Sequence, residues 1–376
     1  MSGVIRAGCL QANAQVRPDQ LGPDEVDLWQ KLRELSPALE APFYTPTFAS
    51  AVYAAGADAW VARIIDEDGS LIGFAPFQMR SRGEGVTVGD DMANRSGPIL
   101  IENQALTKDA LLSASGLSSF SFSHIPVELN SLRFLDTDVT ESSGLRINLH
   151  DGAQRYFELL RDYNRPFLKN VEKRERKLAQ EVGPLRFEWS SRELPDALAR
   201  LIEVKRLQYS GTGVTDALRD NWRQKLLYIL LQEKNEECKG VLSTLWAGNT
   251  WVASTYNLRS ASSLHGWFPA YNPSLTTYGP GHLIRFHVLR HMAAEGLQMF
   301  DFGQGLNSHK KEYLTEEYAL LRGFFHASSL RGYIHKIKHS LRWRLRSRTV
   351  SISSAKTARA GDLEMRSSAE LRGVAL

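Results

Sequence analysis

The stretch "SLTTYGPGHLIRFHVLRHMAAEGLQMFDFGQG", from Ser274 to Gly305, decides the fold of the second half of the chain. Gly279-Pro280-Gly281 precedes apolar residues at helical spacing, and the short apolar strand LQMFDFG follows. The first turn of a helix carries N–H groups without intrahelical acceptors, at the positive end of the helix dipole. Pro280 suits the first helical position, and the flanking glycines let a bulky group approach the backbone. The stretch predicts either a tight turn or an anion-binding loop.

Both halves of the chain combine helices with antiparallel hairpins. The first half predicts a helix within Pro42–Gly56 and a hairpin around Asp66-Glu67-Asp68-Gly69. The second half predicts two helical stretches broken near Arg165-Pro166, then two helices and three strands ahead of the quoted stretch. Each half follows the order helix, hairpin, further strand, helix, strand. The pattern therefore predicts an α+β fold with mixed, mostly antiparallel sheets flanked by helices, and it is compatible with a structural duplication.

Length and composition narrow the class of protein. A chain of 376 residues favours two domains, and 43% hydrophobic with 23% charged residues is ordinary for a globular protein. No apolar run reaches the ~20 residues of a membrane span, and the N-terminus lacks a signal-peptide core. Cys9 and Cys238 show no metal-ligand spacing. We expect a cytoplasmic protein without a metal.

The C-terminal segment differs in charge from the rest of the chain. From Arg331 onward it carries 11 Lys/Arg and 3 Asp/Glu, so the remaining body is slightly acidic and nucleic-acid binding by the body is disfavoured. Ile334, Ile337, Leu341 and Leu345 predict a basic amphipathic helix. It could rest on anionic lipid, through residues 331–348, or dock its apolar face on the body, which we favour. We expect disorder beyond Ser347.

We divide the chain into four parts: a loose segment 1–40, a first half 41–150, a second half 151–330 and the basic tail 331–376.

The second half resembles the GNAT acyltransferase superfamily, and more narrowly its CelD (cellulose-biosynthesis) branch, which is related to the FemAB peptidyltransferases. The resemblance rests on "YNPSLTTYGPGHLIRFHVLRHMAAEGLQMFDFGQGLNSHKKEY", with Pro280-Gly281, Asp301-Phe302-Gly303 and His309-Lys310 in the order typical of that branch. "PFYTPTFASAV" and "GSLIGFAPFQMR" in the first half match its usual opening, so the resemblance covers roughly residues 40–327. It implies tandem GNAT-like halves. Thr276 stands where the usual phosphate loop has Arg or Gln, a departure from the family pattern.

The resemblance also implies an acyl-CoA cosubstrate, with acetyl-CoA expected. In the superfamily, backbone N–H groups of the loop before the crossing helix hold the CoA pyrophosphate. The matching residues here are Tyr278, Gly279, Gly281 and His282. Without the resemblance, Gly-Pro-Gly before a helix is more often only a turn.

Acyl transfer from a thioester needs a base for the nucleophile and a proton donor for the thiolate. We expect His265 as the base, Asp301 as the second candidate, and Tyr271 or Tyr278 as the proton donor. Lys310 is expected to bind an anionic acceptor or the acyl carrier. The alternatives are a satisfied sheet histidine, an aspartate that caps a turn, and a solvated loop around His309 and Lys310.

A basic face is predicted on the helix that follows Pro166. Arg165, Lys169, Lys173 and Lys177 recur at four-residue spacing and so share one side of the helix. Lys169 and Lys173 are candidate contacts for an anionic polysaccharide, a nucleotide-sugar or a tRNA acceptor end. A solvated face with interspersed glutamates is the simpler alternative.

The sequence thus predicts an acyl-CoA-dependent acyltransferase acting on an amine or hydroxyl of a sugar or polysaccharide precursor. The alternatives are FemAB-like aminoacyl transfer from tRNA, and a non-catalytic scaffold with a membrane-facing tail. The expected location is the cytoplasm, free or peripheral to the inner membrane.

Overall fold

The computed structural model describes residues 3–5, 15–101, 104–129, 132–133, 138–192, 194–212 and 215–341. The helices are α1 (Pro23–Glu34), α2 (Pro46–Ala54), α3 (Lys108–Ala114), α4 (Gly152–Tyr163), α5 (Arg165–Glu181), α6 (Leu194–Thr212), α7 (Asn221–Gln232), α8 (Pro280–Met292) and α9 (Ser308–Lys311). The strands of the large sheet are β2 (Gln15–Val16), β3 (Ala59–Ile65), β4 (Leu71–Ser81), β5 (Glu84–Thr87), β6 (Ile99–Leu100), β8 (Ser119–Pro126), β10 (Asp138–Asn148), β11 (Leu185–Glu188), β12 (Lys239–Ala247), β13 (Thr250–Arg259), β14 (Ser263–Tyr271), β15 (Met299–Gln304) and β16 (Glu316–His326). A small separate sheet contains β1 (Gly3–Ile5), β7 (Gln104–Thr107) and β9 (Leu132–Arg133).

One twisted sheet runs through both halves, in the order β11-β12-β13-β14-β15-β10-β16-β8-β5-β4-β3-β2. In the first half, β3, β4 and β5 form a meander, and after α3 the chain returns as β8, parallel to β5. In the second half, β12, β13 and β14 form a meander, and after α8 the chain returns as β15, parallel to β14. The α+β class with a mostly antiparallel sheet flanked by helices is confirmed.

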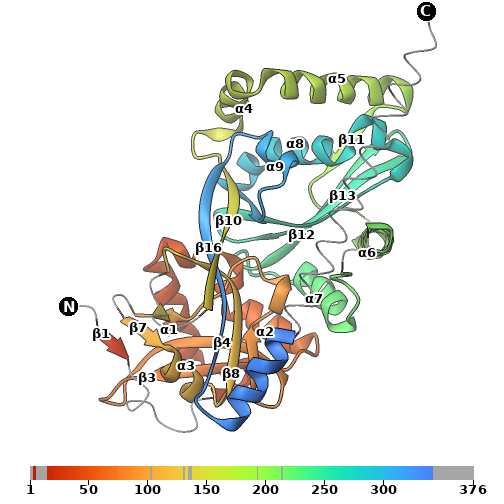
Figure 1. Cartoon of the computed structure of the whole chain (residues 1–376). Coiled ribbons are helices and arrows are strands. Elements are labelled where there is room, and N and C mark those ends of the chain that lie inside the picture. The colour runs from red at the N-terminus through yellow and green to blue at the C-terminus, as the bar shows by residue number, and fades with distance from the viewer. Residues whose placement is uncertain are drawn as a thin grey trace, which may run out of the picture.

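The two halves exchange their last strands. β10 follows β8 in the chain but pairs with β15, and β16 follows β15 but pairs with β8. β10 and β16 also pair with each other along most of their length, so they join the halves at the centre of the molecule (Figure 1). Neither half can complete its sheet alone.

Matching bulges support a duplicated fold. Between Phe122 and Ile125, β8 has two residues where β16 has one, and the second of them, His124, has φ 62°. Between Asp301 and Gln304, β15 has two residues where β10 has one, and the second, Gly303, has φ 68°. A bulge of the same type at the same position in both halves favours the structural duplication suggested by the order of elements.

Two hydrophobic cores lie on the sheet. One core is formed by buried side chains of the first half together with the apolar faces of α6 and α7. The other core lies under α4, α5 and α8. Figure 1 shows α4 and α5 above α8 at one end of the molecule. The crossing helix α8 is therefore covered from outside, while its N-terminus stays at the edge of the second core.

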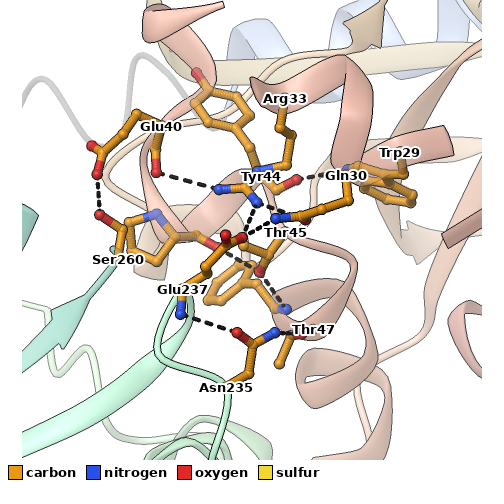
Figure 2. Close-up of polar contacts among 12 residues, drawn as sticks. Trp29, Gln30, Arg33, Glu40, Tyr44, Thr45, Thr47, Asn235, Glu237 and Ser260 are labelled. Atoms are coloured by element: carbon orange, nitrogen blue, oxygen red, sulfur yellow. Dashed lines mark hydrogen bonds and ion pairs between the residues drawn. The ribbon is translucent and has the colours of Figure 1, made fainter. Parts of the chain in front are cut away.

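Polar contacts lock α1 and α2 of the first half to turns of the second (Figure 2). Glu237 accepts hydrogen bonds from Gln30 and Arg33, the latter over 2.7 Å. Asn235 Nδ2 donates to Thr47 Oγ1 over 2.9 Å, and Glu40 accepts from the hydroxyl of Ser260. This interface between the halves fixes the loop that precedes β14. Strand β14 carries His265, the predicted base.

Three expectations need correction. Residues 15–40 are not loose, because α1 buries Trp29, whose Nε1 donates to the Tyr44 carbonyl over 2.7 Å. No strand was expected after LQMFDFG, but β16 (Glu316–His326) follows it and pairs with β10 and β8. In the C-terminal segment, residues 330–341 do form a helix, but its apolar side chains face away from the body. The predicted disorder beyond Ser347 lies outside the described residues.

Candidate functional site

The two strands that flank α8 separate after a short parallel contact. Their register ends with His265 opposite Asp301, and beyond this pair β14 and β15 are not joined. β14 also has a bulge directly after this point, where Gly266 to Phe268 oppose Asn257 and Tyr256 on β13. Bulges and strand ends of this kind are common beside binding sites, because they leave backbone groups without ladder partners. The opening between β14 and β15 lies at the carboxyl ends of both strands, beside the N-terminus of α8.

The Gly-Pro-Gly loop begins α8 as predicted. Gly279 has φ 65° and ψ 52°, and its N–H donates to the Thr276 carbonyl over 3.0 Å. The N–H of His282 donates to the Gly279 carbonyl over 3.0 Å. The N–H of Gly281, at the second helical position, has no intrahelical acceptor, and a Cβ at Gly281 would meet nothing within 4 Å. Of the expected backbone donors, Gly281 therefore has both a free N–H and open space.

Four basic residues gather where α8 and α9 meet the end of β15, and we name them the cation group: His282, Arg285, His309 and Lys310. Arg285 lies one helical turn after Gly281, with its guanidinium carbon 4.5 Å from the Phe302 ring centre. Its Nη1 is buried without a hydrogen-bond partner. No carboxylate lies among the groups that influence its pKa, which burial lowers. Within the described residues, Arg285 is thus a partly buried cation without an acidic partner.

The other members of the cation group are shifted in the same direction. Burial and the charge of Arg285 lower the pKa of Lys310 to about 8 and the pKa of His282 to about 4. Burial and Arg285 also lower the pKa of His309. Lys310 Nζ donates to the carbonyls of Phe302 and Gln304, over 3.1 and 2.8 Å, which leaves one of its three donors. Glu312 lies 3.5 Å from His282 Nε2, so the four cations have fewer carboxylates than positive charges around them.

A further basic side chain lies against the loop itself. The Nη1 atom of Arg174, on α5, would come within 2.7 Å of a Cβ placed on Gly279. Arg174 also lowers the pKa of His282. The loop is therefore bordered by a guanidinium on one side and the cation group on the other.

On the face toward the first half, His265 and Asp301 lie in one buried polar network. Asp301 accepts from Arg95 over 2.5 Å, from the hydroxyl of Tyr318 over 2.8 Å and from the N–H of Gly303 over 2.6 Å. Burial alone would raise the pKa of Asp301, but the Arg95 guanidinium and the other donors hold it below its usual value. Asp301 is therefore an ionised carboxylate that joins the two halves.

His265 is 2% exposed and lies between Asp301 and the serines of the preceding turn. Its Nε2 is 3.2 Å from Ser263 Oγ, which donates to Glu40 over 2.9 Å. Its Nδ1 lies 3.6 Å from Asp301 Oδ2 and has no hydrogen-bond partner. Burial lowers the pKa of His265, against the opposing effect of Asp301, so the imidazole is neutral at pH 7. A neutral imidazole with an unbonded nitrogen beside a carboxylate can accept a proton.

The remaining predicted residues lie apart from this network. Tyr271 is six residues beyond His265 on β14, ~20 Å at ~3.3 Å per residue. Tyr278 points away from the opening, with its hydroxyl 2.5 Å from Glu181. Lys169 and Lys173 are exposed on the outer face of α5. The structure therefore brings together His265 and Asp301 on one face of the sheet and Gly281, His282 and Lys310 on the other.

Two hollows elsewhere are poorer candidates. One of about 350 Å³ lies among α4, α5 and the end of α8, and its charged side chains are paired: Arg161 with Glu172, and Arg290 with Glu175. The other lies between β5, β8 and α3, at the place in the first half that corresponds to the opening. It measures about 10 Å³, close to the size of one water molecule, and is lined mainly by apolar side chains.

Sequence reasoning missed Arg285, Arg174 and Arg95. Arg285 had a signal, because it lies four residues after Gly281 and so on the same side of the helix. Arg95 had none, since it is 206 residues from Asp301 in the chain and meets it only across the two halves.

A protein-family comparison covers the segment of the chain that carries the opening. Residues 165–311 match a protein family described as "Acetyltransferase (GNAT) domain". The matched segment runs from the start of α5 to the end of α9 and includes the opening, the loop and the cation group. The second half thus carries a GNAT-type acetyltransferase domain, and the protein is an acyltransferase by class. No curated protein shows a significant match to the sequence.

Several solved structures are similar in outline. The C-terminal domain of a protein described as a lysylphosphatidylglycerol synthetase, from Agrobacterium fabrum, is 12% identical with a TM-score of 0.47, covering 80% of this chain and 91% of that one. FemX is 12% identical with a TM-score of 0.48, covering 74% and 90%. A tandem GNAT protein from the clavulanic acid pathway is 9% identical with a TM-score of 0.44, covering 83% and 96%. Likenesses this weak say nothing about substrate.

Proposed function

We propose that the protein transfers an acyl group from acyl-CoA to an amine or hydroxyl of a sugar or polysaccharide precursor, as in the CelD branch. The observation that carries the donor assignment is the buried, unpartnered Nη1 of Arg285, one helical turn after the open face of Gly281. A diphosphate would supply the missing negative charge, and the N-terminus of α8 favours an anion at this place. Gly281, Arg174 and the cation group are the residues that would hold it.

The reaction follows from the two faces of the opening. The acceptor nitrogen or oxygen attacks the thioester carbonyl carbon, the carbon–sulfur bond breaks, and the acceptor proton must leave. We assign proton removal to His265, with Asp301 stabilising the imidazolium that forms. Lys310, charged below about pH 8, would stabilise negative charge on the donor side. Tyr271 and Tyr278 remain the candidates for protonating the thiolate, and the Tyr278 hydroxyl donates to Glu181.

The donor assignment is tested by thermal shift with acetyl-CoA, longer acyl-CoAs and free CoA. Each should raise the melting temperature, because a ligand present at 100 times its Kd stabilises by about 2.7 kcal/mol. Gly281→Trp should abolish the shift, since the indole would fill the space beside the loop. Gly211→Trp, also at a glycine with open space, is the matched control and should keep it. Wild-type protein that does not respond to any coenzyme would overturn the proposal.

The role of His265 is tested by His265→Gln. We expect kcat to fall about 10²–10⁴-fold with little change in KM for the donor, as for loss of a general base. Because burial lowers the pKa of His265, wild-type kcat/KM should be highest near pH 7 and fall at lower pH, where the imidazole gains a proton. It should also fall above about pH 8, where Lys310 loses the charge assigned to it. A histidine with only a structural role would instead show a lower melting temperature with kcat nearly unchanged.

A second candidate is transfer from an acyl-tRNA, favoured by the basic face of α5. Arg165, Lys169, Lys173 and Lys177 are all exposed, and among the described residues Lys169 and Lys173 have no carboxylate partner. This alternative requires tRNA binding that weakens steeply with salt and survives Gly281→Trp. The double variant Lys169→Gln, Lys173→Gln should then reduce tRNA binding.

We place the enzyme in the cytoplasm. Within the described residues, no helix combines the length and apolar character needed to cross a bilayer.

A further inference from the structure

The helix at residues 330–341 contacts the first half through its polar face and not through its apolar face. His335 Nδ1 is 2.8 Å from Ser119 Oγ, and the His339 ring stacks on Phe324 with ring centres 4.1 Å apart. Gly332 lies so close to the Ala327 carbonyl that a Cβ there would meet it at 2.1 Å. The face that contacts the body therefore contains one glycine and two histidines, and at its border the Tyr333 ring contacts His326, with ring centres 5.0 Å apart.

The opposite face is apolar and exposed. The exposed fractions are Leu330 81%, Ile337 62%, Leu341 55%, Tyr333 53% and Ile334 44%. At ~100° per residue, these five side chains fall within an arc of about 100°, centred roughly opposite Gly332, His335 and His339. In Figure 1 this helix is the blue one at the lower end, beside β8 and α3 and far from α5. Exposed apolar residues on one face mark an interaction surface.

Basic side chains border this apolar face. Arg331 and Lys338 lie on one side of the arc and Lys336 on the other, and residues 330–341 contain no acidic residue. The sequence that continues from Leu341 reads RWRLRSR, with four further arginines. An apolar stripe between rows of cations is complementary to a bilayer that carries anionic headgroups, in which alkyl side chains enter the acyl boundary and cations meet phosphates.

We propose that residues 330–341 form a surface on which the protein binds an anionic lipid bilayer, with Leu330 and Ile337 inserted. The docking through His335 and His339 fixes the orientation, so the apolar face is presented outward without any rearrangement. This surface lies on the first half and is separate from the opening beside α8, so it does not depend on the proposed reaction.

Cosedimentation of the full chain with vesicles tests the surface. Vesicles of phosphatidylcholine and phosphatidylglycerol in equal parts should bind the protein, and phosphatidylcholine alone should bind it weakly. The double variant Leu330→Ser, Ile337→Ser should bind at least about tenfold more weakly, because two inserted side chains are lost. Lys336→Gln and Lys338→Gln should each cost about fivefold on the anionic vesicles.

Matched controls separate this result from a general effect of exposed leucines. Leu35→Ser, directly after α1, and Leu207→Ser, on α6, remove side chains that are 63% and 65% exposed, and these variants should bind vesicles like the wild type. All variants should keep the coenzyme-induced thermal shift. Equal binding to both vesicle types, or serine variants that bind like the wild type, overturns the proposal. So does a concentration-dependent dimer that the serine variants abolish, because the surface would then hold a second copy.

Discussion

Replacing Arg285 by methionine is expected to make the free protein more stable and its binding of the acyl donor much weaker. The side chain is partly buried among Phe300, Phe302 and Tyr313, its buried Nη1 has no partner, and an apolar side chain of similar length removes that cost. We expect a gain of about 1–2 kcal/mol in the free energy of unfolding. Loss of a buried charge contact to the ligand should weaken donor binding at least about 30-fold. Chemical denaturation and calorimetric titration of acetyl-CoA measure the two effects.

Arg290→Met is the matched control on the same helix. Arg290 pairs with Glu175 over 3.2 Å at the surface, so its loss should change stability by less than about 1 kcal/mol and leave donor binding unchanged. An Arg285→Met protein that is less stable than the wild type and still binds acetyl-CoA would show that the guanidinium has a structural role and is not part of an anion site.

Replacing Arg95 by leucine is expected to lower the free energy of unfolding by about 3–5 kcal/mol, because it leaves the Asp301 carboxylate buried without its cation. Asp301 is 1% exposed and Arg95 is 8% exposed, and the pair joins the first half to β15. Arg95 also lies over the Tyr318 ring, 3.9 Å from its centre. The effect should appear as a lower midpoint in chemical denaturation, with both halves unfolding together because they share β10 and β16.

The double variant Arg95→Leu, Asp301→Leu should recover part of this loss, since no buried charge then remains unpaired. Arg146→Leu is the control, because Arg146 pairs with Glu316 at an exposed position and its loss should cost less than about 1 kcal/mol. A loss below 1 kcal/mol for Arg95→Leu would mean that water reaches Asp301, and the network would then not clamp the two halves.

The Arg95–Asp301 ion pair links the stability of the protein to the proposed chemistry. The pKa of Asp301 is held below its usual value, so its contribution to stability is present above the ordinary carboxyl range and is lost as the pH falls through the lowered pKa. The same carboxylate lies 3.6 Å from His265 Nδ1. A substitution that weakens the contact between the two halves at Asp301 therefore also changes the environment of His265, the proposed base.

Local patterns in the sequence were enough for most elements of the second half. The break at Pro166 separates α4 from α5, and Gly248 lies in the turn between β12 and β13. In the first half, Thr45 caps α2 by accepting the N–H of Phe48 over 2.9 Å. These features depend on residues a few positions apart. The helix α1 was missed, although Pro23, two acidic residues in its first turn and two basic residues in its last turn are local signals of a helix.

The sequence by itself determined the α+β class, the helix that opens with Gly279-Pro280-Gly281, and the order in which its strands and helices repeat. Only the tertiary structure decided that β10 and β16 are exchanged, that Arg95 meets Asp301, and that Arg285 is left without an acid. It also decided which side of the helix at 330–341 faces the body. The physical reason is that propensities, caps and turns act over a few residues, whereas strand exchange, ion pairing and desolvation depend on which distant residues the fold brings together.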